Sequence, residues 1–273
     1  MTGTAELDLA RLTSAALTVA REAAQLVLEG HRSRPAVQRK ASYADLVTQY
    51  DLQSERVIRR RLAELTPEIA IVGEEEGGDV GDAPTWLCDP IDGTVNFAHG
   101  HPFFCVSIGL LHRGVPLAGA VVAPALSLEW HGFAGGGAFR NGQPCSVAEP
   151  DGLADALVAT GISPVMRRHG HPEDNLAAFN RVTPTVRDIR RCGSAAIDLT
   201  FVADGTYDAY WERRLAPWDM AAGAALVLAA GGRITNLQGG AYDLTRGYVL
   251  ASNGHVHDAL LELLRPEAEP TQV

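Results

Sequence analysis

Two aspartates lie three residues apart directly after an apolar segment of the chain. The apolar residues 85–88 are followed by Asp89 and Asp92, with Pro90 between the two acids and Gly93 after them. A buried strand end holds two ionised carboxylates this close together only when a cation offsets their repulsion, and hard oxygen ligands suit Mg²⁺. The spacing therefore predicts a magnesium site, although a plain surface turn with an Asx hydrogen bond is an alternative that the spacing leaves open.

The residues after this pair offer groups that bind an anion. A helix that starts near Thr94 would direct the free amides of Gly93 and Thr94 at the space beside the metal, where a helix N-terminus favours phosphate. The hydroxyl of Thr94 would also orient a water molecule. These residues predict a phosphate-binding turn next to the cation site.

An earlier segment repeats the order of an apolar strand, an acid and a glycine-rich turn. The apolar residues 69–72 precede Gly73 and Glu74. Ligands often collect where the strands of a sheet end. Two such strands side by side would bring Glu74 close to Asp89 and Asp92.

Two predicted helix starts in the second half of the chain are candidates for lining the same cleft. Pro217 opens one helix with Asp219 in its first turn, where simple capping of the helix is the alternative interpretation. Gly193, Ser194 and Ala195 open another helix, whose free amides and hydroxyl would bind a substrate oxygen or would only cap the helix. Both alternatives stay open at this level.

Hydrophobic periodicity predicts helices and strands in an order that builds layers of helices and sheets. The amphipathic residues 7–29 form a first helix with Gly30 as its stop, and residues 45–65 form a second helix on which Asp51 and Glu55 lie one turn apart. Glu55 is expected to face solvent. The other predicted strands are residues 69–72, 104–111, 115–122, 128–134, 138–147, 156–161, 185–189, 207–211, 233–235 and 248–251, and the other helices are residues 172–182, 194–203, 217–230 and 257–264.

Composition and charge indicate an ordinary globular protein. The 273 residues, 46% of them hydrophobic, can bury a sizeable core. Acids outnumber bases by 33 to 23, so nucleic acid is not expected as a ligand. The N-terminus lacks the basic start of a signal peptide and the apolar runs are too short to span a bilayer, which predicts a cytoplasmic protein without membrane contact. Four cysteines without zinc spacing are expected as small buried side chains, with one pairing left open: Cys88, Cys105, Cys145 and Cys192.

Three ordered motifs resemble the signature segments of the inositol monophosphatase family. They are Gly73-Glu74-Glu75, then Trp86-x-x-Asp89-Pro90-Ile91-Asp92-Gly93-Thr94-Val95-Asn96-Phe97 with His99-Gly100-x-Pro102, and Pro217-Trp218-Asp219-x-Ala221-Ala222-Gly223. The resemblance implies a mixed α/β fold, an αβαβα layered sandwich, and a homodimer. It also implies lithium-sensitive, Mg²⁺-dependent hydrolysis of phosphate monoesters. The whole chain, residues 1–273, would form one domain, with residues 1–150 carrying the metal motifs, 151–265 completing the site and 266–273 forming a tail.

The resemblance further implies a role for each site residue. The implied metal ligands are Glu74, Asp89, the carbonyl of Ile91, Asp92 and Asp219, with Asp51 near the outermost metal through water. The residues implied for substrate binding are Asp92, Gly93, Thr94, Gly193, Ser194, Ala195, Glu212 and Asp219. Thr94 paired with Glu74 would position the attacking water, and Lys40, by itself a solvated loop lysine, would support the site.

The resemblance implies the type of reaction but leaves several substrates open. Val95 follows the D-G-T motif where relatives that act on 3′-phosphoadenosine 5′-phosphate or histidinol phosphate often carry lysine, so this residue and Glu212 favour inositol 1-phosphate. Fructose 1,6-bisphosphate and other sugar or polyol phosphates stay open as substrates, as do histidinol phosphate and the nucleotide. A regulatory protein that keeps the fold and binds a partner is a further alternative; its mark would be loss of a metal carboxylate, and none is missing.

Overall fold

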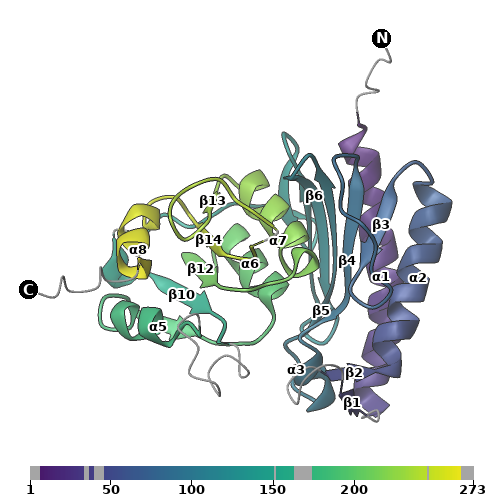
Figure 1. Ribbon diagram of the computed structural model, residues 1–273, viewed down its shortest axis with the longest axis horizontal. Coiled ribbons are helices and arrows are strands. Elements are labelled where there is room, and N and C mark those ends of the chain that lie inside the picture. Colours follow the sequence, from purple (N-terminus) through teal and green to yellow (C-terminus); the bar gives the residue numbers. More distant parts are fainter. Residues whose placement is uncertain are drawn as a thin grey trace, which may run out of the picture.

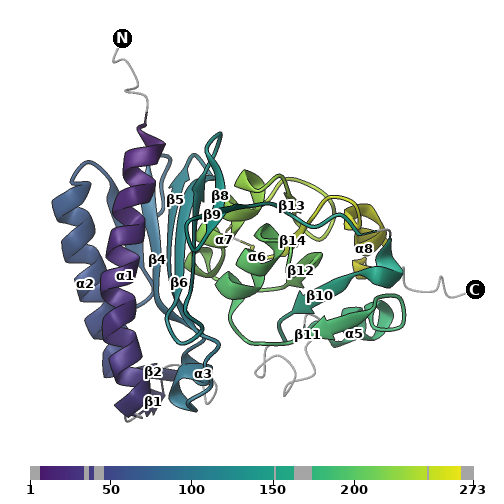
Figure 2. The same ribbon diagram turned by 180° about the vertical axis from the view of Figure 1, so that it is seen from behind.

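Alternating layers of helices and sheets make up the protein, in the order helix, sheet, helix, sheet, helix (Figure 1, and from behind in Figure 2). The computed structural model describes residues 7–33, 37–39, 46–150, 152–162, 174–244 and 246–265. Lys40 and the predicted tail, residues 266–273, lie outside the described residues. The layer order confirms the predicted αβαβα sandwich.

The first outer layer consists of α1 (Leu9–Ser33) and α2 (Gln49–Leu65), which pack side by side on one face of a sheet. Contrary to the prediction, Gly30 does not stop α1, which continues to Ser33. A Cβ atom on Gly30 would lie 2.6 Å from the ring of Tyr50. This glycine therefore allows the close contact between the two helices.

A capping box at Thr48 sets the start of α2, four residues later than predicted. The hydroxyl of Thr48 accepts a hydrogen bond from the amide of Tyr50 at 3.1 Å, and the carboxylate of Asp51 accepts from the amide of Thr48 at 2.7 Å. The residues directly before the helix form β2 (Leu46–Thr48), which pairs antiparallel with β1 (Val37–Arg39). One predicted site residue, Asp51, thus also fixes the local backbone.

The larger sheet has seven strands in sequence order. Its strands β3 and β4 are parallel and each later neighbour is antiparallel. Asn141 and Gly142, a turn signal in the sequence, both have positive φ and form the tight turn that divides residues 138–147 into a hairpin. The strands are β3 (Ala70–Gly73), β4 (Thr85–Asp92), β5 (Cys105–His112), β6 (Val115–Ala123), β7 (Leu128–Phe133), β8 (Gly137–Arg140) and β9 (Gln143–Cys145), with the short helix α3 (Thr94–Ala98) after β4.

The middle layer consists of α6 (Ala195–Ala203) and α7 (Pro217–Ala229), which cover the other face of this sheet. A Cβ atom on Gly109 of β5 or on Gly119 of β6 would lie 2.4 or 2.5 Å from the backbone of Ala222. The two glycines therefore let α7 approach the sheet very closely. This contact joins the second half of the chain to the first.

The smaller sheet has five strands and is covered on its outer face by α5 (Leu176–Val182) and α8 (His257–Leu264). Strands β11, β10 and β12 run parallel, and β14 is antiparallel to both of its neighbours. The strands in spatial order are β11 (Asp188–Arg190), β10 (Leu157–Thr160), β12 (Ala209–Glu212), β14 (Val249–Ser252) and β13 (Arg233–Thr235).

Three hydrophobic cores fill the spaces between the layers. Strand β4 lies between two of them, because Trp86 and Cys88 pack toward α1 and α2 while Leu87 packs toward α6 and α7. A strand buried on both faces needs apolar residues throughout. The acids that follow this run are consequently placed at the edge of the protein interior.

The cysteines and the helices agree only partly with what composition suggested. All four cysteines are free thiols; Cys88 and Cys105 are buried, whereas Cys145 and Cys192 are partly exposed. Among the described helices, none combines the length and the apolar character that crossing a bilayer requires.

Candidate active site

The parallel pairing of β3 with β4 brings the two acidic turns together. Gly73 lies opposite Cys88, and the amide of Glu74 donates a hydrogen bond to the carbonyl of Cys88 at 3.2 Å. Glu74 therefore follows its strand at the same level at which Asp89 follows Cys88. The juxtaposition that the repeated strand pattern predicted is confirmed for the strands.

Asp92 is held by the start of α6, 102 residues away in the sequence. One of its oxygens, Oδ2, accepts hydrogen bonds from the hydroxyl of Ser194 at 2.6 Å and from the amide of Ala196 at 2.7 Å. Ser194 also caps α6 by accepting from the amide of Ile197 at 3.4 Å. The capping interpretation of Ser194 is confirmed, and its hydroxyl also binds the carboxylate of Asp92, whereas the binding of a substrate oxygen stays a prediction.

Asp89 and Asp219 are anchored in the same manner. Asp89 Oδ1 accepts from the amide of Ile91 at 2.9 Å, and Asp219 Oδ2 accepts from the amide of Ala216 at 2.8 Å. No hydrogen bond from a described residue reaches the second oxygen of Asp89, Asp92 or Asp219. Each aspartate thus has one oxygen that fixes its orientation and one that is available to a ligand.

The acids of this region raise each other's pKa. Burial raises the pKa of Asp89 well above its ordinary value, and the charges of Glu74, Asp92 and Asp219 raise it further. Burial and then the charge of Asp92 likewise raise the pKa of Asp219. Several carboxylates in one desolvated place favour a bound cation.

Hard oxygen donors of this kind fit Mg²⁺. No three acidic, histidine or cysteine side chains within the described ranges stand close enough to hold a metal ion by themselves. Backbone carbonyls, water and substrate oxygens supply part of the shell in magnesium sites. The unanchored oxygens of the three aspartates would be among the ligands that the protein supplies.

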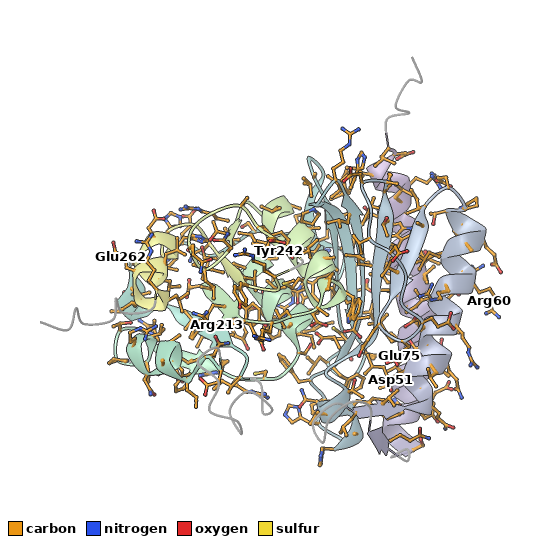
Figure 3. The ribbon with its side chains drawn as sticks, viewed as in Figure 1. Asp51, Arg60, Glu75, Arg213, Tyr242 and Glu262 are labelled. Carbon is orange, nitrogen blue, oxygen red and sulfur yellow. The ribbon has the colours of Figure 1, made fainter. Side chains whose placement is uncertain are left out.

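Thr94 joins the turn after β4 to α2. Its hydroxyl lies 3.0 Å from the carbonyl oxygen of Ile91 and 3.3 Å from Oδ1 of Asp51. Asp51 is fully buried, and burial raises its pKa while the hydrogen bonds from Thr48 lower it. Figure 3 shows Asp51 near Glu75 beside α2, and the charge of Glu75 also raises the pKa of Asp51. Three predicted residues, Asp51, Ile91 and Thr94, therefore meet.

Glu55 does not face solvent as expected but is fully buried. Its oxygens accept hydrogen bonds from the amides of Glu75 at 2.7 Å and Glu76 at 3.0 Å, and from Arg59 at 2.8 Å. Arg59 also donates to the carbonyl of Gly77 at 2.6 Å. Glu55 thus holds the turn that carries Glu74. Its position one helical turn after Asp51 was the signal in the sequence for this inward orientation.

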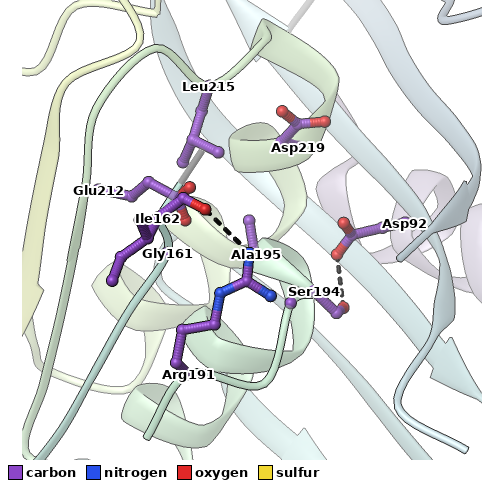
Figure 4. A pocket seen from close by; sticks show the side chains of 10 residues that line it. Asp92, Gly161, Ile162, Arg191, Ser194, Ala195, Glu212, Leu215 and Asp219 are labelled. Carbon is purple, nitrogen blue, oxygen red and sulfur yellow. Dashed lines mark hydrogen bonds between the residues drawn. The ribbon is translucent and has the colours of Figure 1, made fainter. Parts of the chain in front are cut away.

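A pocket of about 190 Å³ opens between the two sheets beside these acids (Figure 4). Asp92 and Asp219 lie on one side of it, and Glu212 at the end of β12 lies on the other. Arg191, which was not predicted as a site residue, also points into it. Six of the predicted residues line this pocket, namely Asp92, Gly193, Ser194, Ala195, Glu212 and Asp219.

Asn96 ties the pocket to the turn after β4. Its side-chain amide donates to the carbonyls of Phe103 at 2.7 Å and Cys192 at 2.8 Å. Asn96 belongs to the quoted motif but received no role from the sequence. It fixes α3 against the segment that leads into α6.

The family model described as the inositol monophosphatase family matches residues 8–269 of the chain. The protein belongs to this family. It is 40% identical to an inositol-1-monophosphatase of Rhizobium meliloti, over 81% of this chain and 84% of that relative. The structure of an inositol monophosphatase from Anabaena superposes with a TM-score of 0.85 at 36% identity, covering 94% of this chain and 96% of the other. A Pseudomonas aeruginosa relative called Nus factor SuhB is 36% identical, over 94% of this chain and 96% of its own length.

The charge of the Glu212 side chain, which lines the pocket of this inositol monophosphatase family member, depends on pH near neutrality. Burial raises its pKa to about 7, although the hydroxyl of Tyr210, which donates to it, and the charge of Arg191 oppose the shift. The unfolded chain releases this proton near 4.5. The folded protein therefore binds more protons between these values, and the resulting stability is full below about pH 4.5 and lost as pH rises through about 7.

We expect Glu212→Gln to raise the melting temperature of the metal-free protein at about pH 8 and to change it little at about pH 5. At the higher pH the wild-type protein must keep an ionised carboxylate in a desolvated place, whereas the amide is neutral at both values. Thermal unfolding in the presence of EDTA measures the difference. An equal shift at both pH values would contradict the assigned titration.

Proposed function

We propose that this protein hydrolyses phosphate monoesters with the help of Mg²⁺ and that inositol 1-phosphate is its substrate. The observation that carries the proposal is the set of three aspartates, Asp89, Asp92 and Asp219, each anchored through one oxygen beside the pocket that contains Glu212. Membership of a family of phosphatases supports the reaction. The name of the Rhizobium relative supports the substrate.

The cation would be held by the side chains of Glu74, Asp89, Asp92 and Asp219 and by the carbonyl of Ile91, with Asp51 farther out. When bound, Mg²⁺ offsets the charge of the carboxylates, lowers the pKa of water and stabilises the leaving oxygen. The anchoring bonds from Ser194, Ala196 and Ala216 keep the aspartate side chains oriented before the substrate arrives. Such preorganisation reduces the reorganisation that the reaction requires.

The remaining groups position water and substrate. The hydroxyl of Thr94 and the carboxylate of Glu74 would orient the attacking water. The amides of Gly93 and Thr94 would hold the phosphate in line with it, since phosphoryl transfer depends mainly on positioning. The water oxygen forms the new bond to phosphorus, the ester bond breaks, and the alkoxide leaves as a hydroxyl with one proton from the water. The segment Gly193, Ser194 and Ala195 would bind the polyol together with Glu212.

Three finer predictions belong to the same proposal. The active form would be a homodimer, and the protein would act in the cytoplasm. Lithium would inhibit it, as the family resemblance implies. Size-exclusion chromatography with light scattering tests the first of these statements directly.

Phosphate release from a panel of substrates tests the proposal. The panel contains inositol 1-phosphate, fructose 1,6-bisphosphate, histidinol phosphate and 3′-phosphoadenosine 5′-phosphate, each with Mg²⁺, with EDTA and with added Li⁺. We expect the highest kcat/KM for inositol 1-phosphate, no release with EDTA and reduced release with Li⁺. A different leading substrate under the same metal dependence would contradict only the substrate assignment.

A regulatory role is the second candidate function, and the name of the Pseudomonas relative favours it. In that role the protein would bind a component of the transcription machinery. Absence of hydrolysis for the whole panel, with the protein folded, would favour this role over catalysis. Binding and catalysis are also compatible with each other, because the pocket lined by Asp92, Glu212 and Asp219 lies between the two sheets, away from the outer helix layers.

A further inference from the structure

Arg191 brings a positive charge into a pocket whose other charged side chains are acids. Its guanidinium points into the pocket beside Glu212, opposite Asp92 and Asp219 (Figure 4). One of its nitrogens, Nη2, donates to the carbonyl of Ile162 at 3.0 Å. The arginine is therefore anchored through one nitrogen and keeps further donors for a ligand.

Two glycines make room for this arginine and for Glu212. A Cβ atom on Gly161 would lie only 1.8 to 2.0 Å from the carboxylate of Glu212, so this carboxylate rests directly on the backbone of Gly161. A Cβ atom on Gly193 would lie 2.9 Å from Nη1 of Arg191, and the φ of +86° at Gly193 also disfavours other residues. The backbone thus leaves room for an acid at the end of β12 and a base directly after β11 to approach the pocket.

The neighbouring Arg190 provides a contrast. Its guanidinium pairs with Asp188 on the same strand, β11, and does not line the pocket. Two consecutive arginines therefore have different environments. Arg191 is the one that a bound substrate would meet.

The charges of the pocket decide which ligand group fits beside Arg191. A second phosphate would approach the guanidinium but would also meet the negative charge of Glu212, which interacts with the buried carboxyl group of Asp198. The charges of Glu212 and Asp92 raise the pKa of Asp198, and that of Arg191 lowers it, so these groups act on one another. When Glu212 is ionised, its carboxylate and the guanidinium of Arg191 together carry no net charge. A neutral ligand group that both donates and accepts hydrogen bonds satisfies both side chains.

We propose that Arg191 is a specificity-determining residue that binds, together with Glu212, two neighbouring hydroxyls of a polyol phosphate. One hydroxyl donates to the carboxylate of Glu212, and the adjacent hydroxyl accepts from the guanidinium of Arg191. The inference rests on the proposed phosphatase function. It names a pair of adjacent hydroxyls as the substrate feature that Arg191 and Glu212 select. It assigns to Gly161 the role of allowing Glu212 to reach that feature.

The test compares kcat/KM of the wild-type protein and its variants on three substrates. Inositol 1-phosphate has adjacent hydroxyls, phenyl phosphate has none, and fructose 1,6-bisphosphate has a second phosphate. We expect Arg191→Ala to lower kcat/KM for inositol 1-phosphate by about tenfold to a hundredfold, mainly through KM, because a hydrogen bond to a charged group is lost. The value for phenyl phosphate should stay within about twofold.

Three further variants make the test specific. Arg190→Ala is the matched control and should leave all three values unchanged. Arg191→Lys should recover only part of the loss, because an ammonium group lacks the planar fork of a guanidinium. Gly161→Ala should lower kcat/KM for inositol 1-phosphate in the same direction as Arg191→Ala, since its methyl group displaces the carboxylate of Glu212.

Three outcomes would overturn the inference. An equal loss on phenyl phosphate would show a structural role for Arg191, and a loss confined to fructose 1,6-bisphosphate would show a second phosphate site. An unchanged Arg191→Ala variant, with the wild-type protein active on inositol 1-phosphate, would overturn the inference alone. A wild-type protein that does not hydrolyse inositol 1-phosphate would contradict the proposed substrate and this inference together.

Discussion

Replacement of Asp92 by asparagine is expected to lower Mg²⁺-dependent phosphate release by about a thousandfold or more while the fold stays intact. A divalent cation supplies several kcal/mol of charge stabilisation in the transition state, and about 4 kcal/mol corresponds to that factor. Asparagine keeps an oxygen that can accept from Ser194 and Ala196, so the local hydrogen bonds survive. What the substitution removes is the negative charge that would hold the cation.

Two measurements on the Asp92→Asn variant separate loss of the cation from loss of the fold. Mg²⁺ should raise the melting temperature of the wild-type protein, because a ligand that binds only the folded state stabilises it. The same addition should shift the variant much less. Without Mg²⁺ the variant should melt at or above the wild-type temperature, since burial raises the pKa of Asp92 and its ionised form is therefore unfavourable. Full activity in the variant would refute the proposed site.

Replacement of Glu55 by glutamine is expected to weaken Mg²⁺ binding by roughly tenfold to a hundredfold and to destabilise the fold by about 3 kcal/mol. Groups that orient metal ligands have effects of this size on affinity, and removing one partner of a buried ion pair is costly. Glu55 now accepts hydrogen bonds from three donors, the amides of Glu75 and Glu76 and the guanidinium of Arg59. The NH2 group of glutamine cannot accept a hydrogen bond, so at least one of these donors would lose its partner. The turn that carries Glu74 would lose its support.

Glu64→Gln on the same helix is the matched control for Glu55→Gln. Glu64 is exposed and pairs with Arg61 one turn earlier, so its loss should change stability by less than about 1 kcal/mol. Chemical denaturation and a titration with Mg²⁺ measure the two effects separately. If the two variants behaved alike, the turn before β4 would not depend on Glu55.

The sequence alone was enough to predict layers of helices and sheets and several of the acids that the fold brings close together. The eight residues of β4 are buried throughout, and two aspartates close to the end of such a strand already require compensation. The neighbouring strand of β4 was also predictable, because the run before Glu74 repeats the same pattern. Helix α8 and strand β13 were predicted with the bounds that the structure has, since periodicity and terminal residues agree there.

Long-range packing explains the predictions that were wrong. Gly30 was expected to end α1, yet the glycine serves the contact with Tyr50 across the helix pair. Glu55 was expected in solvent, yet it accepts bonds from a turn about 20 residues later. Arg191 belongs to none of the three motifs, and only the fold brings it into the pocket. In each case the residue is contacted by another element of the fold, so the neighbouring sequence does not indicate the contact.

The sequence by itself determined the layer order, the acidic strand ends and the family, because periodicity, strand ends and ordered motifs are local properties of the chain. Only the tertiary structure decided which oxygen of each aspartate is anchored, that Glu55 supports the turn of Glu74, and that Arg191 lies beside Glu212 in one pocket. These features depend on side chains that meet from distant elements. Their positions follow from the close packing of α7 on Gly109 and Gly119 and from the pairing of strands, which are properties of the folded chain.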